Sequence, residues 1–383
     1  MTTAKSVESF SLLGGPLYEL GRRLGLVRRE TNTVLLGVAL GWGLWLLIVA
    51  LTLIEGVTNE VFSLLVVGAH ARLLLVIPLF FVCESWVVPR MAAFVGTMTR
   101  SGVVPPDAWP ALNAEVLRIH RWTNWWWPEA VCLLVAIVLE VTRLRLQMYG
   151  ETGGFNSART GVWFVVYFRL GLTLFRFLLF RWIWKWALWC RFLWRVSRLN
   201  LHLMPGHPDR AGGLGSLEGV HERFTPLAVA FSILECASFA ESISAGRLAA
   251  TALYPSLTLL LLFDGAFFLA PLLVFTDKLW DGRTKGVGRY MGLATRYVTE
   301  FEAKWLRDDI PTDAPLLGSP DLQSLADLAN AVSVVKGMRW VTIGPRLLTM
   351  MTLAAAVPLA PLLLFQYPIA ELTQKFFSRL VGF

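Results

Sequence analysis

The chain has 383 residues, of which 55% are hydrophobic and 16% charged, and its mean hydropathy is +0.57. Soluble domains carry about 25% charged and about 45–50% apolar residues, so this composition excludes a water-soluble, secreted, fibrous or disordered protein. The four cysteines stand singly at Cys83, Cys132, Cys190 and Cys236, which excludes a disulfide framework and a paired zinc or redox motif. We therefore expect an all-α polytopic transmembrane helical bundle.

Long apolar runs recur along the chain, and a spanning helix needs about 20 mostly apolar residues to cross about 30 Å of hydrocarbon. This length predicts about seven spans, at residues 33–54, 61–88, 124–142, 161–184, 225–244, 252–276 and 347–366. The span 225–244 is the weakest, and a re-entrant segment is its alternative. We expect residues 1–32 to form a cytoplasmic N-terminal segment rather than a cleavable signal peptide. The last span and an amphipathic tail make up residues 347–383.

The basic residues are distributed unequally between the segments that join the spans. If the N-terminus is cytoplasmic, 25 of the 35 Lys and Arg residues lie in cytoplasmic segments, including the loop 185–224, and 6 lie in external ones. The positive-inside rule predicts this asymmetry. The net charge of +8 is thereby explained by topology, and we expect no nucleic-acid partner.

The polar segment 277–346 is predicted to be a cytoplasmic helical hairpin. Its first half carries a heptad-like apolar seam that alternates spacings of four and three, at Val287, Met291, Ala294, Val298, Phe301 and Trp305. Its second half has one apolar face that includes Leu322, Leu325 and Leu328. The two faces either pack together within one chain, or the seam pairs between subunits of a homo-oligomer; the seam candidates for such pairing are Val287, Met291, Val298 and Phe301.

Ionisable side chains inside the spans are the first candidates for function. Placing a charged side chain at the centre of a membrane helix costs roughly 2.5–3.5 kcal/mol even on insertion scales. Such residues are therefore retained where they form ion pairs, face water or take part in function. The candidates for a polar pathway are Arg72, Glu84, Arg169, Arg176, Glu235, Ser238 and Asp264. The alternative is structural pairing of Glu235 or Asp264 with Arg169 or Arg176.

The segment from 161 to about 200 continues as one helix past its span and is rich in arginine and aromatic residues. Arg169 and Arg176 are seven residues apart and therefore stack on one helix face. Facing a water-filled path, they would favour anions, as rings of arginine do in anion pores. The alternative is that these arginines reach the membrane surface and bind anionic lipids.

The loop 202–222 contains three of the five histidines and a glycine-rich run. Its weak metal candidates are His202, His207, Asp209 and His221, because imidazole and carboxylate groups ligate transition metals. Its candidates for binding a phosphate or another ligand are His207, Asp209, Arg210, Gly212 and Gly213, because glycine-rich loops expose backbone N–H groups. The alternative is a tight turn in which Asp209 caps a backbone amide.

Two segments carry a resemblance. His207 to Gly215 (HPDRAGGLG) and Ser319 to Leu328 (SPDLQSLADL) resemble segments of bacterial polytopic inner-membrane proteins. The resemblance covers mainly the C-terminal half. It implies a multi-pass protein of the bacterial inner membrane and implies no activity.

Three functions remain open. The first is an oligomeric channel or transporter with a pathway that favours anions, and the second is a scaffold that binds anionic lipids or a protein partner. The third is a membrane-embedded enzyme that uses a metal or a nucleotide. Because the sequence contains no P-loop, no H-E-x-x-H and no G-x-S-x-G motif, we expect neither catalysis nor a cofactor.

Overall fold

The computed structural model describes residues 10–28, 31–58, 62–149, 161–247, 253–306 and 320–365. These residues are predominantly helical and contain no strand. The predicted all-α fold with several potential spans and a helical hairpin is therefore confirmed. The predicted C-terminal tail lies outside the described residues.

The helices follow one another with short connections. In chain order they are α2 (Pro16–Arg23), α3 (Val34–Glu55), α5 (Val67–His70), α6 (Ile77–Arg100), α7 (Trp109–Asn124), α8 (Trp127–Tyr149), α9 (Val162–Val165), α10 (Leu172–Ser197), α11 (Ser216–Glu222), α12 (Thr225–Ser244), α13 (Leu253–Leu269), α14 (Thr276–Trp305), α15 (Pro320–Lys336) and α16 (Pro345–Ala356). The π-helical segments η2 (Ala71–Val76) and η5 (Val166–Gly171) join α5 to α6 and α9 to α10. Three-residue 3₁₀ turns precede α5 (η1, Leu64–Val66) and α7 (η3, Pro106–Ala108), and longer 3₁₀ segments follow α13 (η7, Ala270–Phe275) and α16 (η8, Val357–Phe365).

Within the described residues, five helices are long and apolar enough to cross a membrane. They are Val34–Glu55, Val67–Arg100, Ser216–Ser244, Pro255–Trp305 and Pro345–Leu362, and the bent pair Pro106–Asn124 and Trp127–Thr142 would make a sixth. The prediction of about seven was higher because it also counted 161–184, which lies in α9–α10 and is not among these candidates.

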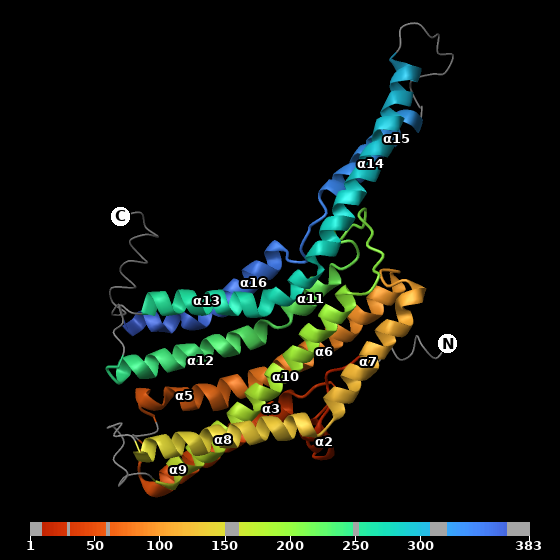
Figure 1. Cartoon of the computed structure of the whole chain (residues 1–383). Coiled ribbons are helices and arrows are strands. Elements are labelled where there is room, and N and C mark those ends of the chain that lie inside the picture. The colour runs from red at the N-terminus through yellow and green to blue at the C-terminus, as the bar shows by residue number, and fades with distance from the viewer. Residues whose placement is uncertain are drawn as a thin grey trace, which may run out of the picture.

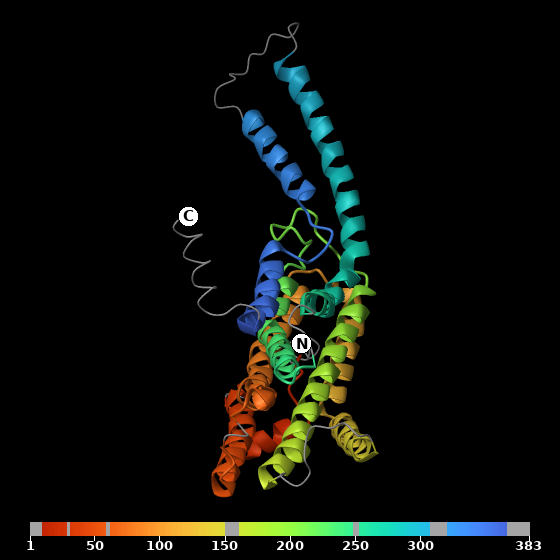
Figure 2. The same ribbon diagram turned by 90° about the vertical axis from the view of Figure 1, so that its left-hand side faces the viewer.

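Figure 1 shows α3, α8, α12 and α13 extending along one bundle, while α14 and α15 project from it as a long hairpin. The chain changes direction at η7, between α13 and α14. Figure 2 shows the hairpin standing clear of the other helices, with α14 the longer of its two arms. The predicted helical hairpin is therefore present as α14 and α15, and its cytoplasmic location stays a prediction.

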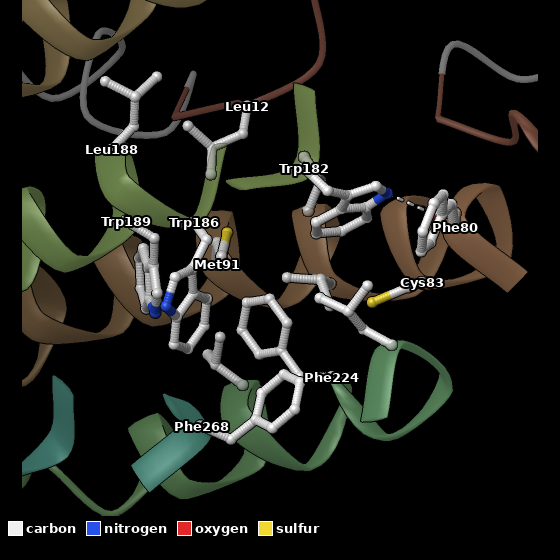
Figure 3. Close-up of a cluster of buried hydrophobic side chains, with 14 of the residues drawn as sticks. Leu12, Phe80, Cys83, Met91, Trp182, Trp186, Leu188, Trp189, Phe224 and Phe268 are labelled. Carbon is white, nitrogen blue, oxygen red and sulfur yellow. Dashed lines mark hydrogen bonds between the residues drawn. The ribbon is translucent and has the colours of Figure 1, made fainter. Parts of the chain in front are cut away.

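An aromatic core forms where α6, α10, α12 and α13 meet (Figure 3). Trp182, Trp186 and Trp189 recur at spacings of four and three and therefore share one buried face of α10. The rings of Trp186 and Phe224 lie edge to face, with centroids 4.7 Å apart. The indole of Trp182 donates a hydrogen bond to the carbonyl of Phe80 at 3.1 Å. This core fixes the positions of the charged side chains described next.

Candidate functional site

A network of four charged side chains is buried between α6, α8 and α10. The Arg181 guanidinium contacts Glu84 at 3.1 Å and Glu129 at 2.8 Å, and Lys185 contacts the other oxygen of Glu84. The side chains of Glu84 and Arg181 are 1% and 3% exposed. Two positive and two negative charges thus balance one another away from solvent.

The N-terminal segment is attached to the same network. Arg181 donates to the carbonyl of Gly14 at 3.5 Å, and Glu129 accepts a hydrogen bond from the Leu17 amide at 2.9 Å. Arg181 and Lys185 are four residues apart, which places both on one face of α10. The pathway candidate Glu84 is therefore engaged in structural ion pairs with Arg181 and Lys185. Sequence reasoning missed Glu129, the second partner of Arg181, although it lies within the expected span 124–142.

Two other pathway candidates also have partners. Arg176 forms an ion pair with Glu140 at 2.8 Å, and Arg72 donates to the Tyr167 hydroxyl at 2.8 Å. The partner of Arg176 is thus Glu140, rather than Glu235 or Asp264. Arg169 lies on an exposed face of η5. The structure does not bring Arg169 and Arg176 together with the acidic candidates.

Asp264 differs from these charges. It is 4% exposed on α13, and its Oδ2 atom makes no hydrogen bond within the described part of the chain. It lines a cavity of about 90 Å³ between α12, α13 and α16, together with Ala228, Met351 and Thr352. A buried carboxylate thus faces an internal space.

Glu235 is the charged neighbour of Asp264. It is half-buried on α12, seven residues after the cavity residue Ala228 and therefore on nearly the same face, and it interacts electrostatically with Asp264. Ser238 is exposed, and its carbonyl accepts a hydrogen bond from the Ser242 hydroxyl at 2.9 Å. Glu235 is therefore near enough to Asp264 for their charges to interact, whereas the lining of the cavity includes Asp264 but neither Glu235 nor Ser238.

The glycine-rich loop is organised around Asp209. Its carboxylate accepts hydrogen bonds from the amides of Ala211 and Gly215 at 2.8 Å and of Gly213 at 3.2 Å. Burial acts to raise the pKa of the Asp209 carboxyl, but these donors and the His207 ring hold that pKa below its usual value. These three amides point at Asp209 and are not free to bind a phosphate.

Other hydrogen bonds fix the remaining candidates of this loop. Arg210 adopts a positive φ of 54°, and its carbonyl accepts from the Arg339 amide at 2.7 Å. The Gly212 carbonyl accepts from the Met204 amide at 3.2 Å. The loop is therefore tied to the segment that follows α15.

The four metal candidates do not converge. His207 lies 2.8 Å from Asp209, but His221 is fully buried elsewhere, with Nδ1 donating to the Phe268 carbonyl at 2.9 Å and Nε2 accepting from Trp189 at 3.3 Å. His202 is exposed. Within the described residues, no three His, Cys, Asp or Glu side chains are placed to hold a metal ion.

The hairpin buries only part of its seam. Val287 and Phe301 are half-buried, whereas Met291 is 40% and Val298 is 37% exposed. The two helices are joined at their far end by Asp321, which accepts from Trp305 at 3.0 Å and pairs with Lys304 at 2.7 Å. The intramolecular hairpin thus leaves apolar seam residues uncovered.

No protein family, curated protein or solved structure with which we compared the chain matches it. The arrangement of the side chains is therefore the basis on which a function can be assigned.

Proposed function

We propose that the protein is an integral membrane channel or transporter that moves protons or small cations, with Asp264 and Glu235 as the groups that accept them. The observation that carries this proposal is the buried carboxylate of Asp264, which faces a cavity without a hydrogen-bond partner for Oδ2. The basic residues and the resemblance of the loop to bacterial proteins support an inner-membrane location with a cytoplasmic N-terminus.

Asp264 differs in its energetics from the other buried charges. Glu84, Glu140 and Arg181 each have an oppositely charged partner, which compensates the cost of removing them from water. Asp264 has Glu235, a like charge, as its electrostatic neighbour. Ionisable residues inside a membrane that lack compensation mark proton relays and ion pathways. Two neighbouring carboxylates can take up a proton or a cation between them.

The structure gives less support to a pathway that favours anions. That expectation required Arg169 and Arg176 to present two uncompensated positive charges to water. The ion pair of Arg176 with Glu140 neutralises one of them. The carboxylate pair is therefore the better candidate for the transported charge.

The test is flux through liposomes that contain the purified protein. A potassium diffusion potential drives protons or sodium ions, and an internal pH-sensitive or sodium-sensitive dye reports them. We expect Asp264→Asn to lower the flux at least tenfold while the thermal stability stays at or above that of the wild type, because the substitution removes an uncompensated buried charge. Asp107→Asn, on the exposed turn η3, is the matched control and should leave the flux unchanged. Absence of wild-type flux, or equal flux in Asp264→Asn, would overturn the proposal.

A second candidate function, a scaffold that binds anionic lipids, is favoured by α2. Leu20 in this short helix is 53% exposed and Leu24, the residue that follows it, is 63% exposed, beside the exposed side chains of Arg22 and Arg23. Apolar and basic groups on one exposed helix are typical of a segment that lies in the membrane interface. Retention of anionic lipid through purification, together with absence of flux, would favour this function.

A further inference from the structure

A second cavity lies outside the bundle, at the base of the hairpin. It has a volume of about 580 Å³, is open to solvent and is lined by the loop segment 202–208 and one face of α14. It shares no residue with the Asp264 cavity. It is also distinct from the backbone amides of the glycine-rich loop, which bind Asp209.

The polar groups of this cavity are basic or neutral. Lys285 and Arg289 are four residues apart and reach it from the same face of α14, beside Tyr290, and the loop contributes His202 and His207. None of the described residues that line it is acidic. The nearby carboxylates belong to the rim: Asp281 pairs with Lys285 at 2.7 Å on the exposed surface, and Asp209 holds the His207 ring at 2.8 Å.

Close packing holds the two walls in register. A Cβ on Gly286 would lie 2.4 Å from the Cβ of Pro205, so glycine is required for this approach of α14 to the loop. A Cβ on Gly206 would lie 3.0 Å from the Tyr290 hydroxyl, which places that hydroxyl over the loop backbone. The hydrogen bonds from the loop amides to Asp209 fix the conformation of the loop, so the cavity is formed without a ligand.

We propose that this cavity binds an anion that carries a phosphomonoester or diphosphate together with an apolar or ring portion. Arginine and lysine are the side chains that bind phosphate through charge-assisted hydrogen bonds. The volume of the cavity falls within the range of roughly 300–1,000 Å³ that is usual for small-molecule sites. A bare phosphate would fill only part of this cavity. Leu203, Met204 and Pro205 supply apolar lining for the rest of the ligand. A soluble nucleotide and the headgroup of an anionic lipid share this chemistry.

The experiment measures binding to the full-length protein in detergent, by titration calorimetry with pyrophosphate and with ATP, and to the protein in nanodiscs with and without phosphatidic acid. Thermal unfolding with each probe gives a second readout. Arg289→Gln is the test variant. Arg296→Gln is the matched control, because it removes the same charge seven residues further along the same face of α14, beyond the cavity.

We expect saturable binding that Arg289→Gln weakens about tenfold or more, as the loss of a hydrogen bond to a charged group implies, and that Arg296→Gln changes less than twofold. Binding of pyrophosphate or ATP identifies a soluble ligand, and stabilisation by phosphatidic acid alone identifies a lipid headgroup. Absence of saturable binding to every probe, or equal weakening by both substitutions, would overturn the proposal. Since no readout depends on flux, this outcome is independent of the proposed transport.

Discussion

Glu84 illustrates how a carboxylate is retained in the interior of this bundle. It accepts from Arg181 and from Lys185, and Arg181 in turn contacts Glu129. Each charge of the network compensates another, so removing one leaves a neighbour buried without a partner. Such a loss costs more than the pair contributes, because the remaining charge keeps its full desolvation penalty.

We therefore expect Glu84→Gln to lower stability by about 3–5 kcal/mol, the range for breaking a buried ion pair. The measurement is thermal or denaturant unfolding of the purified protein in detergent. Adding Lys185→Met to Glu84→Gln should recover part of the loss, because it removes the unpaired ammonium group while Arg181 keeps Glu129. Glu19→Gln, in an exposed pair with Arg22, is the control and should leave stability unchanged. A Glu84→Gln protein as stable as the wild type would contradict the structural role of the network.

The charged residues of the spans were predictable from the sequence, but their partners were not. Hydropathy and composition identified Glu84, Arg176 and Asp264 as unusual positions. Whether each is paired depends on contacts between helices distant in the chain, such as Arg176 with Glu140, 36 residues apart. Sequence spacing relates residues on one helix only, so it could not separate the paired Glu84 from Asp264.

At the scale of the elements, the hairpin of α14 and α15 leaves part of its apolar surface uncovered. In α14 the buried residues are Leu279 and Gly286, and in α15 Val335. Met291 and Val298 are seven residues apart, and both are exposed on the same face of α14. A heptad-spaced apolar face on a projecting helix is typical of a coiled-coil partner surface. Pairing of this seam between subunits accordingly remains our prediction.

Charged substitutions separate this prediction from its alternative. Met291→Glu and Val298→Glu should shift the detergent-solubilised protein from oligomer to monomer without lowering its unfolding temperature, because a charge in an intersubunit seam opposes association. Light scattering coupled to size-exclusion chromatography gives the mass. Thr299→Glu introduces the same side chain at an exposed polar position of α14 and should leave the mass unchanged. Misfolding of Met291→Glu and Val298→Glu, or a wild type that is already monomeric, would refute pairing of the seam.

Hydropathy does not predict where the helices of this chain begin and end. The expected span 61–88 continues as α6 to Arg100, and α14 follows the span of α13 after the short η7 segment. Hydropathy records where a segment is apolar enough for lipid, whereas a helix ends where its backbone hydrogen bonds end. The continuation of the arginine-rich helix to about residue 200 was recognisable from its periodicity, and α10 ends at Ser197.

At the scale of the whole molecule, the bundle has two different ends. Figure 1 shows the end of α3, the start of α9 and the end of α12 at one of them. The hairpin of α14 and α15 and the turn between α6 and α7 lie toward the other. The segments 277–346 and 185–224 contain 16 of the 35 Lys and Arg residues, and their described parts lie toward this second end. The two segments that the charge count assigns to one side thus lie toward one end of the bundle, and the alternation of the spans stays a prediction.

The charge count leads to a prediction about orientation. A reporter fused after residue 320 should lie in the cytoplasm, whereas reporters fused after residues 155 and 246 should lie outside, because basic segments are retained on the cytoplasmic side during insertion. A phosphatase that is active only outside and a fluorescent protein that folds only inside give opposite signals at each position. Residue 246 follows α12 directly and so tests whether 225–244 spans the membrane or re-enters. If residues 246 and 320 reported the same side, the alternation would fail between α12 and α14. Were all three positions inverted, the basic end would face outward and the phosphate-binding cavity would open to the exterior.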